Sequence, residues 1–467
     1  MFLDLGLGAT LNRFTSQLLT VKDYKRLNST ASFGFLMFLC LGVLAGLVMV
    51  GIGLFLPSLI RGATATAYSR GFLLMCCFAG MIAMRFWGYS ARGLLFGAQR
   101  YDLVNAIQAG GAVLRAGLVV AMFLMVPSSG LVTIGLCYIL SAIFEASSMW
   151  IFAKRQIPAL RLDIRTIEMD TVKEVMNFSV FVLIMAVTTM LIWNIPVFLT
   201  GRLYGAEAVA FLSLALLLLD QVQQVAGGFG FSLIPVAGKY GALGEAEMLR
   251  MLTIKGTKYC AILCFPIGVL AVIFGHPILE WFRHGFGWTW ALLGILMIPY
   301  LIRMTQTPAI SVLIGAKSVR QFALGQIVVV VVIGLLAWLF GEYLRMGLYG
   351  VALGAAIPIF FFSFIFQANY ACRQIGLKWS NYMIQSYGRV SIGTIPAAGV
   401  GIILLRYFYP NSLLMIAAEG LVCILIFAVS AWYFELAADD REQIYAVFGR
   451  KGNIVIKDGQ KSYGGDL

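Results

Sequence analysis

Charged residues and histidines are scarce in this sequence. Of its 467 residues, 12% are charged, about half the share of roughly 25% that is usual in soluble globular domains. The chain has no glycine-rich GxxxxGK[ST] phosphate loop, which argues against a pump that binds ATP. Only His276 and His284 are histidines, and the eight cysteines show no metal-ligand spacing. We therefore expect no metal, no cofactor and no enzymatic activity, with the cysteines serving as small apolar packing residues.

Long apolar runs fill the sequence instead, since 61% of the residues are hydrophobic. Residues 1–19 lack the pattern of a secretory signal peptide and predict only a partial helix, because polar residues interrupt them. Each later run is long enough to cross a hydrocarbon core of about 30 Å. The sequence thus predicts an all-α polytopic membrane protein with twelve full spans, at about 31–54, 71–97, 103–126, 131–152, 175–200, 207–235, 259–281, 289–313, 323–343, 349–372, 390–408 and 412–434.

The lysines orient these spans. When the spans alternate across the membrane, every lysine falls on one side or in the tail, and such an excess marks the cytoplasmic face. The C-terminus is then cytoplasmic. The net charge of +13 sets topology in short loops, so we expect no nucleic-acid partner. The twelve lysines are Lys22, Lys25, Lys154, Lys173, Lys239, Lys255, Lys258, Lys317, Lys378, Lys451, Lys457 and Lys461.

The chain also repeats itself. Leu95-Phe96-Gly97-Ala98-Gln99 and Leu313-Ile314-Gly315-Ala316-Lys317 each end a predicted helix, and they are 218 residues apart. Six helices per unit is an even number, so the units run parallel and build two lobes around a central cavity. We predict an N-terminal lobe at 1–152, a cytoplasmic linker at 153–174, a C-terminal lobe at 175–372, an extra helix pair at 385–434 and a cytoplasmic tail at 435–467. A second longer cytoplasmic loop is expected at 236–258.

Four stretches resemble one known family. Leu5–Phe14 resembles the end of its second helix, and Gly97–Asn105 resembles the turn between its fourth and fifth helices. Asn194–Gly205 and Leu233–Pro235 resemble the ends of its seventh and eighth helices. The family is the polysaccharide repeat-unit flippases of the Wzx type, in the superfamily of the multidrug and toxin extrusion (MATE) transporters. One departure is Asn194-Ile195-Pro196, where family members often have an acidic residue.

The resemblance implies fourteen helices, so the first would lie upstream of Met1. It also implies translocation of a polyprenyl-pyrophosphate-linked oligosaccharide from the cytoplasmic to the outer leaflet, by alternating access, for polysaccharide or O-antigen biosynthesis. The location would be the bacterial inner membrane. The expected partners are the lipid-linked oligosaccharide, membrane lipids, H⁺ or Na⁺, and the polysaccharide polymerase machinery.

Ionisable residues at membrane depth are the candidate functional groups, because they are costly there and usually face a cavity or a partner. Arginine suits a pyrophosphate head, since its fork forms bidentate, charge-assisted contacts with phosphate and stays protonated. We predict a cationic cavity, which the resemblance also implies. Its candidate residues are Arg13, Arg85, Arg92, Arg115 and Arg303.

Alternatives stay open for several of these groups. Arg92 and Arg13 lie near helix ends, where long side chains snorkel to the interface. Arg303 has Asp220 as an alternative partner, and Glu145 and Asp4 are alternative partners for the first-lobe arginines. Asp220 is also the candidate for ion coupling, because coupled transporters use a buried carboxylate to bind H⁺ or Na⁺.

Two other functions compete with the flippase. A MATE-like, cation-coupled drug exporter predicts a cavity dominated by carboxylates, whereas arginines outnumber carboxylates at mid-span here. A non-transporting scaffold of a polysaccharide-assembly complex is the third hypothesis, and the expected absence of the first helix favours it.

Overall fold

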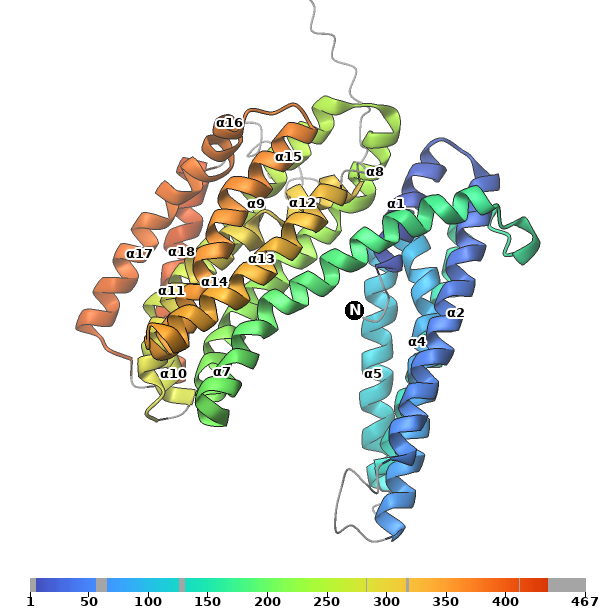
Figure 1. Cartoon of the computed structure of the whole chain (residues 1–467), viewed down its shortest axis with the longest axis horizontal. Helices are drawn as coiled ribbons and strands as arrows, with labels where there is room; N and C mark the ends of the chain where they lie inside the picture. The colour runs from blue at the N-terminus through green and yellow to red at the C-terminus, as the bar shows by residue number, and fades with distance from the viewer. Residues whose placement is uncertain are drawn as a thin grey trace, which may run out of the picture.

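The computed structural model describes residues 6–55, 65–125, 131–282, 284–315, 319–410 and 412–435. These residues are almost entirely helical and contain no strand, as the sequence predicts. Figure 1 shows two groups of helices that meet at one end and diverge toward the other. Asp4 and the tail from residue 436 lie outside the described residues.

The first lobe contains α1 (Leu7–Thr20), α2 (Tyr24–Leu54), α4 (Ala65–Gly97), α5 (Tyr101–Met125) and α6 (Leu131–Gln156). Asp23 caps α2 by accepting a hydrogen bond from the backbone N–H of Arg26 at 3.0 Å. Between α4 and α5, Gln99 adopts a left-handed φ of 60°. The Arg100 guanidinium then donates two bonds to Asp102, at 3.0 and 2.9 Å. This side-chain pair closes the turn between α4 and α5.

The helix α7 (Met169–Phe231) folds back on itself at Gly205, where φ is 84° and ψ is −176°. Only glycine adopts this backbone conformation readily. A Cβ on Gly201 would lie 3.1 Å from Val209 Cγ2, so the two arms run side by side after the bend. The arms correspond to the predicted spans 175–200 and 207–235. Figure 1 shows the first arm crossing from one lobe to the other.

The second lobe contains the part of the first arm of α7 that packs on α11 and α13, the return arm, and the helices that follow it. A final pair of helices, α17 and α18, packs against its side. The elements are α8 (Leu233–Leu243), α9 (Ala246–Ile273), α10 (Gly275–Phe282), η3 (Gly287–Thr289), α11 (Trp290–Thr305), α12 (Thr307–Gly315), α13 (Arg320–Trp338), η4 (Leu339–Tyr343), α14 (Gly347–Phe361), η5 (Phe362–Gln367), α15 (Ala368–Gln374), α16 (Trp379–Met383), η6 (Ile384–Gly388), α17 (Arg389–Tyr407), α18 (Leu413–Ser430) and η7 (Ala431–Glu435).

Eleven helical segments in the described residues are long and apolar enough to cross a membrane. One of them, Met169–Leu243, has 75 residues and contains two of the twelve predicted spans, because it bends at Gly205. Each predicted span therefore corresponds to a helical segment, and the protein is a multi-pass membrane protein. The loop predicted at 236–258 was wrong, since this stretch is helical except for the break at Gly244, whose φ is 72°. The lysines of this stretch are typical of a solvated loop, which is why the sequence predicted one there.

The linker between the lobes contains η2 (Ile164–Thr166) and is bound to the start of α2. Asn28 Nδ2 donates to the Ala159 carbonyl at 3.1 Å, and Asn28 Oδ1 accepts from the Arg161 N–H at 2.9 Å. Lys25 of α2 forms an ion pair with Glu168, the residue that precedes α7. The linker is thereby held at the end of the molecule where the lobes meet.

The glycines of the two repeated motifs make the same kind of contact. A Cβ on Gly97 would collide with Thr15 of α1, and one on Gly315 would come within 2.6 Å of Ala237 Cβ of α8. Small residues thus let α4 approach α1, and α12 approach α8. These two contacts fix the helices α1 and α8, which pack on each other across the lobes.

A tight helix crossing in the second lobe gives a stability prediction. A Cβ on Gly354 of α14 would overlap the backbone nitrogen and Cα of Ala337 in α13. Overpacking against atoms that cannot rotate away costs roughly 1–3 kcal/mol. We expect Gly354→Ala to lower the unfolding temperature in detergent, measured by tryptophan fluorescence. Gly294→Ala is the matched control, because nothing lies within 4 Å of its Cβ; equal unfolding temperatures would contradict this packing.

Candidate functional site

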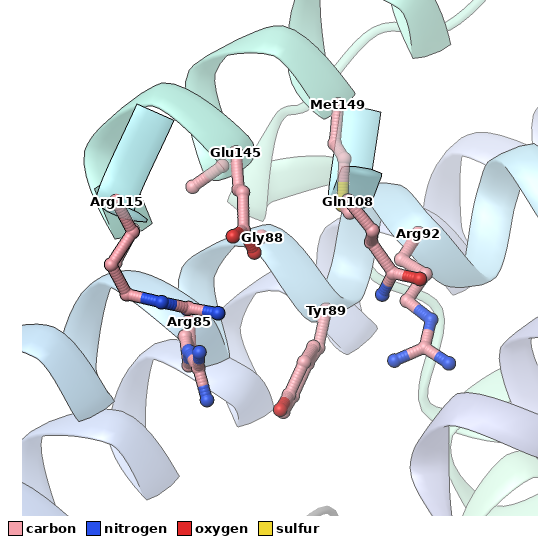
Figure 2. Close-up of a pocket in the computed structure, with 10 residues that line it drawn as sticks. Arg85, Gly88, Tyr89, Arg92, Gln108, Arg115, Glu145 and Met149 are labelled. Carbon is pink, nitrogen blue, oxygen red and sulfur yellow. The ribbon is translucent and has the colours of Figure 1, made fainter. Parts of the chain in front are cut away.

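A cavity of about 210 Å³ lies between α4, α5 and α6 of the first lobe. Three of the five predicted arginines line it, and Figure 2 shows their side chains around a common space. The lining residues are Arg85, Gly88, Tyr89, Arg92, Gln108, Arg115, Ala142, Glu145, Ala146 and Met149. In Figure 1, α5 lies on the side of this lobe that faces the second lobe.

Helical periodicity explains this convergence. On α4, Arg85, Tyr89 and Arg92 follow the spacing i, i+4, i+7 and share one face. On α5, Gln108 and Arg115 are also seven residues apart. The third wall comes close because Gly88 has no side chain, and a Cβ there would lie 3.1 Å from Ala146 Cβ of α6. The cavity therefore lies between α4 and α5, and α6 forms its third wall.

The guanidinium groups of Arg85 and Arg115 have no acidic partner. Among the residues that the structure describes, no ion pair within 4.0 Å involves either of them. Arg115 lies over the Tyr138 ring, with Cζ 5.0 Å from the centroid. Arg92 lies 5.0 Å from the Phe96 centroid. In a membrane interior such cations need a counter-ion or water.

Glu145 of α6 is the single carboxylate among the lining residues, and it is half-buried. Its charge is attracted by those of Arg85, Arg115 and Arg92. Figure 2 shows its carboxylate near the arginines, on the side of Gly88. The three arginines and this carboxylate give the cavity a net charge of +2 when Glu145 is ionised.

Arg13 does not line this cavity. It is 1% exposed, and its Cζ lies 4.9 Å from the Phe14 ring centroid and 4.1 Å from that of Phe178. These cation–π contacts hold it between α1 and the start of α7. Its Nε has no hydrogen-bond partner among the residues that the structure describes. Arg13 is thus a buried packing residue of the region that joins the lobes, and it does not reach solvent by snorkelling.

Arg303 lies in the other lobe and does not line the cavity either. It is 6% exposed, and its Nη2 donates a long bond of 3.4 Å to Thr189 Oγ1. No described residue forms a hydrogen bond with its Nη1. The alternative pairing with Asp220 does not form, because Asp220 is exposed and its Oδ2 accepts from Gln224 Nε2 at 3.0 Å.

Sequence reasoning missed Tyr89 and Gln108 as cavity residues, and named Glu145 only as a partner. The signal that identifies the first two is spacing. Tyr89 lies four residues after Arg85, and Gln108 lies seven before Arg115. Glu145 has no such signal, because its place depends on how α6 packs against α4 and α5.

No protein-family model matches the chain, and a search of curated proteins found no match. Among solved structures, a MATE transporter in its bent conformation is similar, with a TM-score of 0.71 and 16% identity over 82% of this chain and 85% of that one. An outward-facing multidrug resistance MATE transporter of the MOP superfamily is similar with a TM-score of 0.68 and 15% identity, over 80% and 84% of the two chains.

A third similar structure is a MOP superfamily transporter from Pyrococcus furiosus, with a TM-score of 0.69 and 15% identity over 80% of this chain and 84% of that one. Its binding pocket is described as having reversed polarity, which suggests a different function for that protein. At these identities the likeness concerns the fold. The chain therefore has the fold of MATE transporters of the MOP superfamily.

Proposed function

We propose that this protein moves a polyprenyl-pyrophosphate-linked oligosaccharide from the cytoplasmic to the outer leaflet by alternating access. One observation carries the proposal: three guanidinium groups line a single cavity at membrane depth, and no acidic group of the described residues lies within 4.0 Å of Arg85 or Arg115. Phosphate oxygens are the ligands that such unpaired arginine forks bind best.

The size of the cavity supports a head-group site. Its volume of about 210 Å³ is below the roughly 300–1,000 Å³ of pockets that enclose a whole small molecule. A pyrophosphate group fits this space, while the saccharide and the polyprenyl tail extend outside it. The tail then stays in lipid, and only the charged head needs a polar route across the membrane.

The charges of the cavity also suit this head. A pyrophosphate diester carries two negative charges, and the cavity carries a net +2 with Glu145 ionised. Gln108 and Tyr89 add neutral hydrogen-bond donors beside the arginines. These donors suit the bridging oxygen and the two ester oxygens of the pyrophosphate. A neutral or cationic cargo gains nothing from this arrangement.

Alternating access requires that the lobes separate where they now meet. Three side chains of the first lobe donate to backbone carbonyls of the second: Ser16 to Pro235 at 2.6 Å, Gln17 to Gly315 at 3.0 Å and Tyr101 to Ser232 at 3.2 Å. The lysine bias puts this end on the cytoplasmic side. We therefore assign the structure to the outward-open state of the cycle.

The rival function is a cation-coupled drug exporter, which the MATE fold also fits. It requires a cavity dominated by carboxylates, and this cavity has three arginines and one carboxylate. In the Pyrococcus furiosus transporter a pocket of reversed polarity is taken to suggest a different function. The same argument favours an anionic cargo here.

Binding and uptake measurements separate these functions. The purified protein is titrated with inorganic pyrophosphate at several salt concentrations, and proteoliposomes are tested for uptake of the cationic dye ethidium. We expect pyrophosphate to bind and its affinity to fall as salt rises, because screening weakens charge attraction. Ethidium uptake without pyrophosphate binding would establish the exporter, and neither activity would support the scaffold.

We keep Asp220 as the proposed site of coupling to H⁺ or Na⁺. Unlike the buried carboxylate predicted from the sequence, it is exposed on the return arm of α7, where its Oδ2 accepts from Gln224 Nε2. Asp220→Asn is expected to make transport independent of the ion gradient while pyrophosphate binding stays unchanged. Flipping is measured with the gradient intact and after an ionophore. Glu207→Gln, another exposed carboxylate of α7, is the control; a full gradient response in Asp220→Asn would rule out this role.

A further inference from the structure

The carboxylate of Glu145 is unusual because it shares a cavity with three arginines and contacts none of them directly. No ion pair within 4.0 Å and no hydrogen bond joins Glu145 to another residue in the part of the chain that the structure describes. It is half-buried, and Coulomb attraction to Arg85, Arg115 and Arg92 is its main interaction with charged groups. These arginines from α4 and α5 are the charged residues that line the cavity with it.

Gly111 of α5 makes room for this carboxylate. A Cβ at that position would collide with Oε1, Cγ and Cδ of Glu145. The carboxyl group therefore lies directly against the bare backbone of α5, on the wall that also carries Arg115. Because residue 111 has no side chain, the Glu145 carboxylate has room between α5 and α6.

We propose that Glu145 is the internal counter-ion of the arginine cavity, and that its charge lowers the affinity of Arg85 and Arg115 for the cargo's phosphate oxygens. In the empty site the carboxylate offsets part of the repulsion between the guanidinium groups. When the head binds, its oxygens take the direct, bidentate positions that Glu145 leaves open. The same negative charge then weakens the bound state and speeds release. This inference rests on the proposed function and adds the residue that sets affinity and release.

Glu145→Gln tests the inference, because it keeps the shape and removes the charge. Binding of inorganic pyrophosphate is measured by titration, and flipping of the fluorescent lipid-linked oligosaccharide is measured in proteoliposomes. We expect pyrophosphate to bind at least about tenfold more tightly and flipping at saturating cargo to slow several-fold. Glu145→Asp keeps the charge and should stay within about threefold of the wild type in both assays. Glu145→Ser is a second neutral variant for use if the glutamine protein does not fold.

The outcomes separate this inference from the function on which it rests. Equal pyrophosphate affinity in wild type and in a folded neutral variant would overturn the counter-ion role. If the wild-type affinity still depends on Arg115, the proposed function survives that result. Weaker binding in Glu145→Gln would show instead that the carboxylate positions the arginines. Absence of pyrophosphate binding in every protein would contradict the anion site itself.

Discussion

Flipping of the lipid-linked oligosaccharide falls at least about a hundredfold in the Arg85→Ala/Arg115→Ala double variant. Both guanidinium groups line the cavity and form no ion pair within 4.0 Å in the part of the chain that the structure describes, so both are available to phosphate. A hydrogen bond to a charged group contributes about 1.5–3 kcal/mol, and losing two such contacts accounts for this fall. The measurement is loss of fluorescent cargo from one leaflet of proteoliposomes.

Two controls make this result specific. Arg85→Lys/Arg115→Lys keeps the charge and loses the bidentate fork, so we expect an intermediate rate. Arg202→Ala removes an exposed arginine near the bend of α7 and should leave the rate unchanged. Folding is followed by thermal unfolding in detergent. If the folded double alanine variant flips the cargo at the wild-type rate, the cavity does not bind the cargo's phosphate groups during transport.

A disulfide between Ser16→Cys and Gly238→Cys is expected to stop transport completely. Gly238 of α8 faces α1, and a Cβ on it would lie 3.6 Å from Ser16 Cβ. That separation falls within the roughly 3.5–4.5 Å between Cβ atoms in disulfides. The bond would hold the lobes together where Ser16 already donates to Pro235. Because alternating access requires this end to open, the oxidised protein cannot complete a cycle.

The lock must be reversible to support alternating access. We expect a reductant to restore flipping, and either single cysteine to transport normally under oxidant. The background carries Cys40→Ser and Cys76→Ser, since these two native cysteines are not buried. Formation of the disulfide is checked by mobility on a non-reducing gel. Full transport by the cross-linked protein would show that the lobes need not part at α1 and α8.

The sequence predicts much of the fold, because membrane spans depend on local apolar length and on the lysine bias. Each predicted span has its helix, and Gly205 explains why two of them form one bent element. The stretch 236–258 was predicted wrongly as a loop. A lysine-containing helix near the membrane surface and a cytoplasmic loop have similar amino-acid compositions. Local composition does not tell these two apart.

The candidate site was predictable only where periodicity determines it. Arg85 and Arg92 share a face of one helix, and the structure brings Arg115 to the same cavity. Arg13 and Arg303 also lie within predicted helices, but their side chains contact other residues. Tertiary packing determines these contacts. The place of the Glu145 side chain depends on Gly111 in a different helix. Such a pairing has no signal in a single sequence.

The most direct test of the central claim compares head groups in the wild-type protein. Proteoliposomes are loaded with a fluorescent polyprenyl-pyrophosphate oligosaccharide, or with the same lipid and sugar joined through a neutral linker. The arginine cavity predicts that the pyrophosphate lipid flips at least about tenfold faster than in protein-free vesicles, while the neutral lipid flips at the protein-free rate. Equal flipping of the two lipids, or no flipping of the pyrophosphate lipid above the protein-free rate, would contradict the claim.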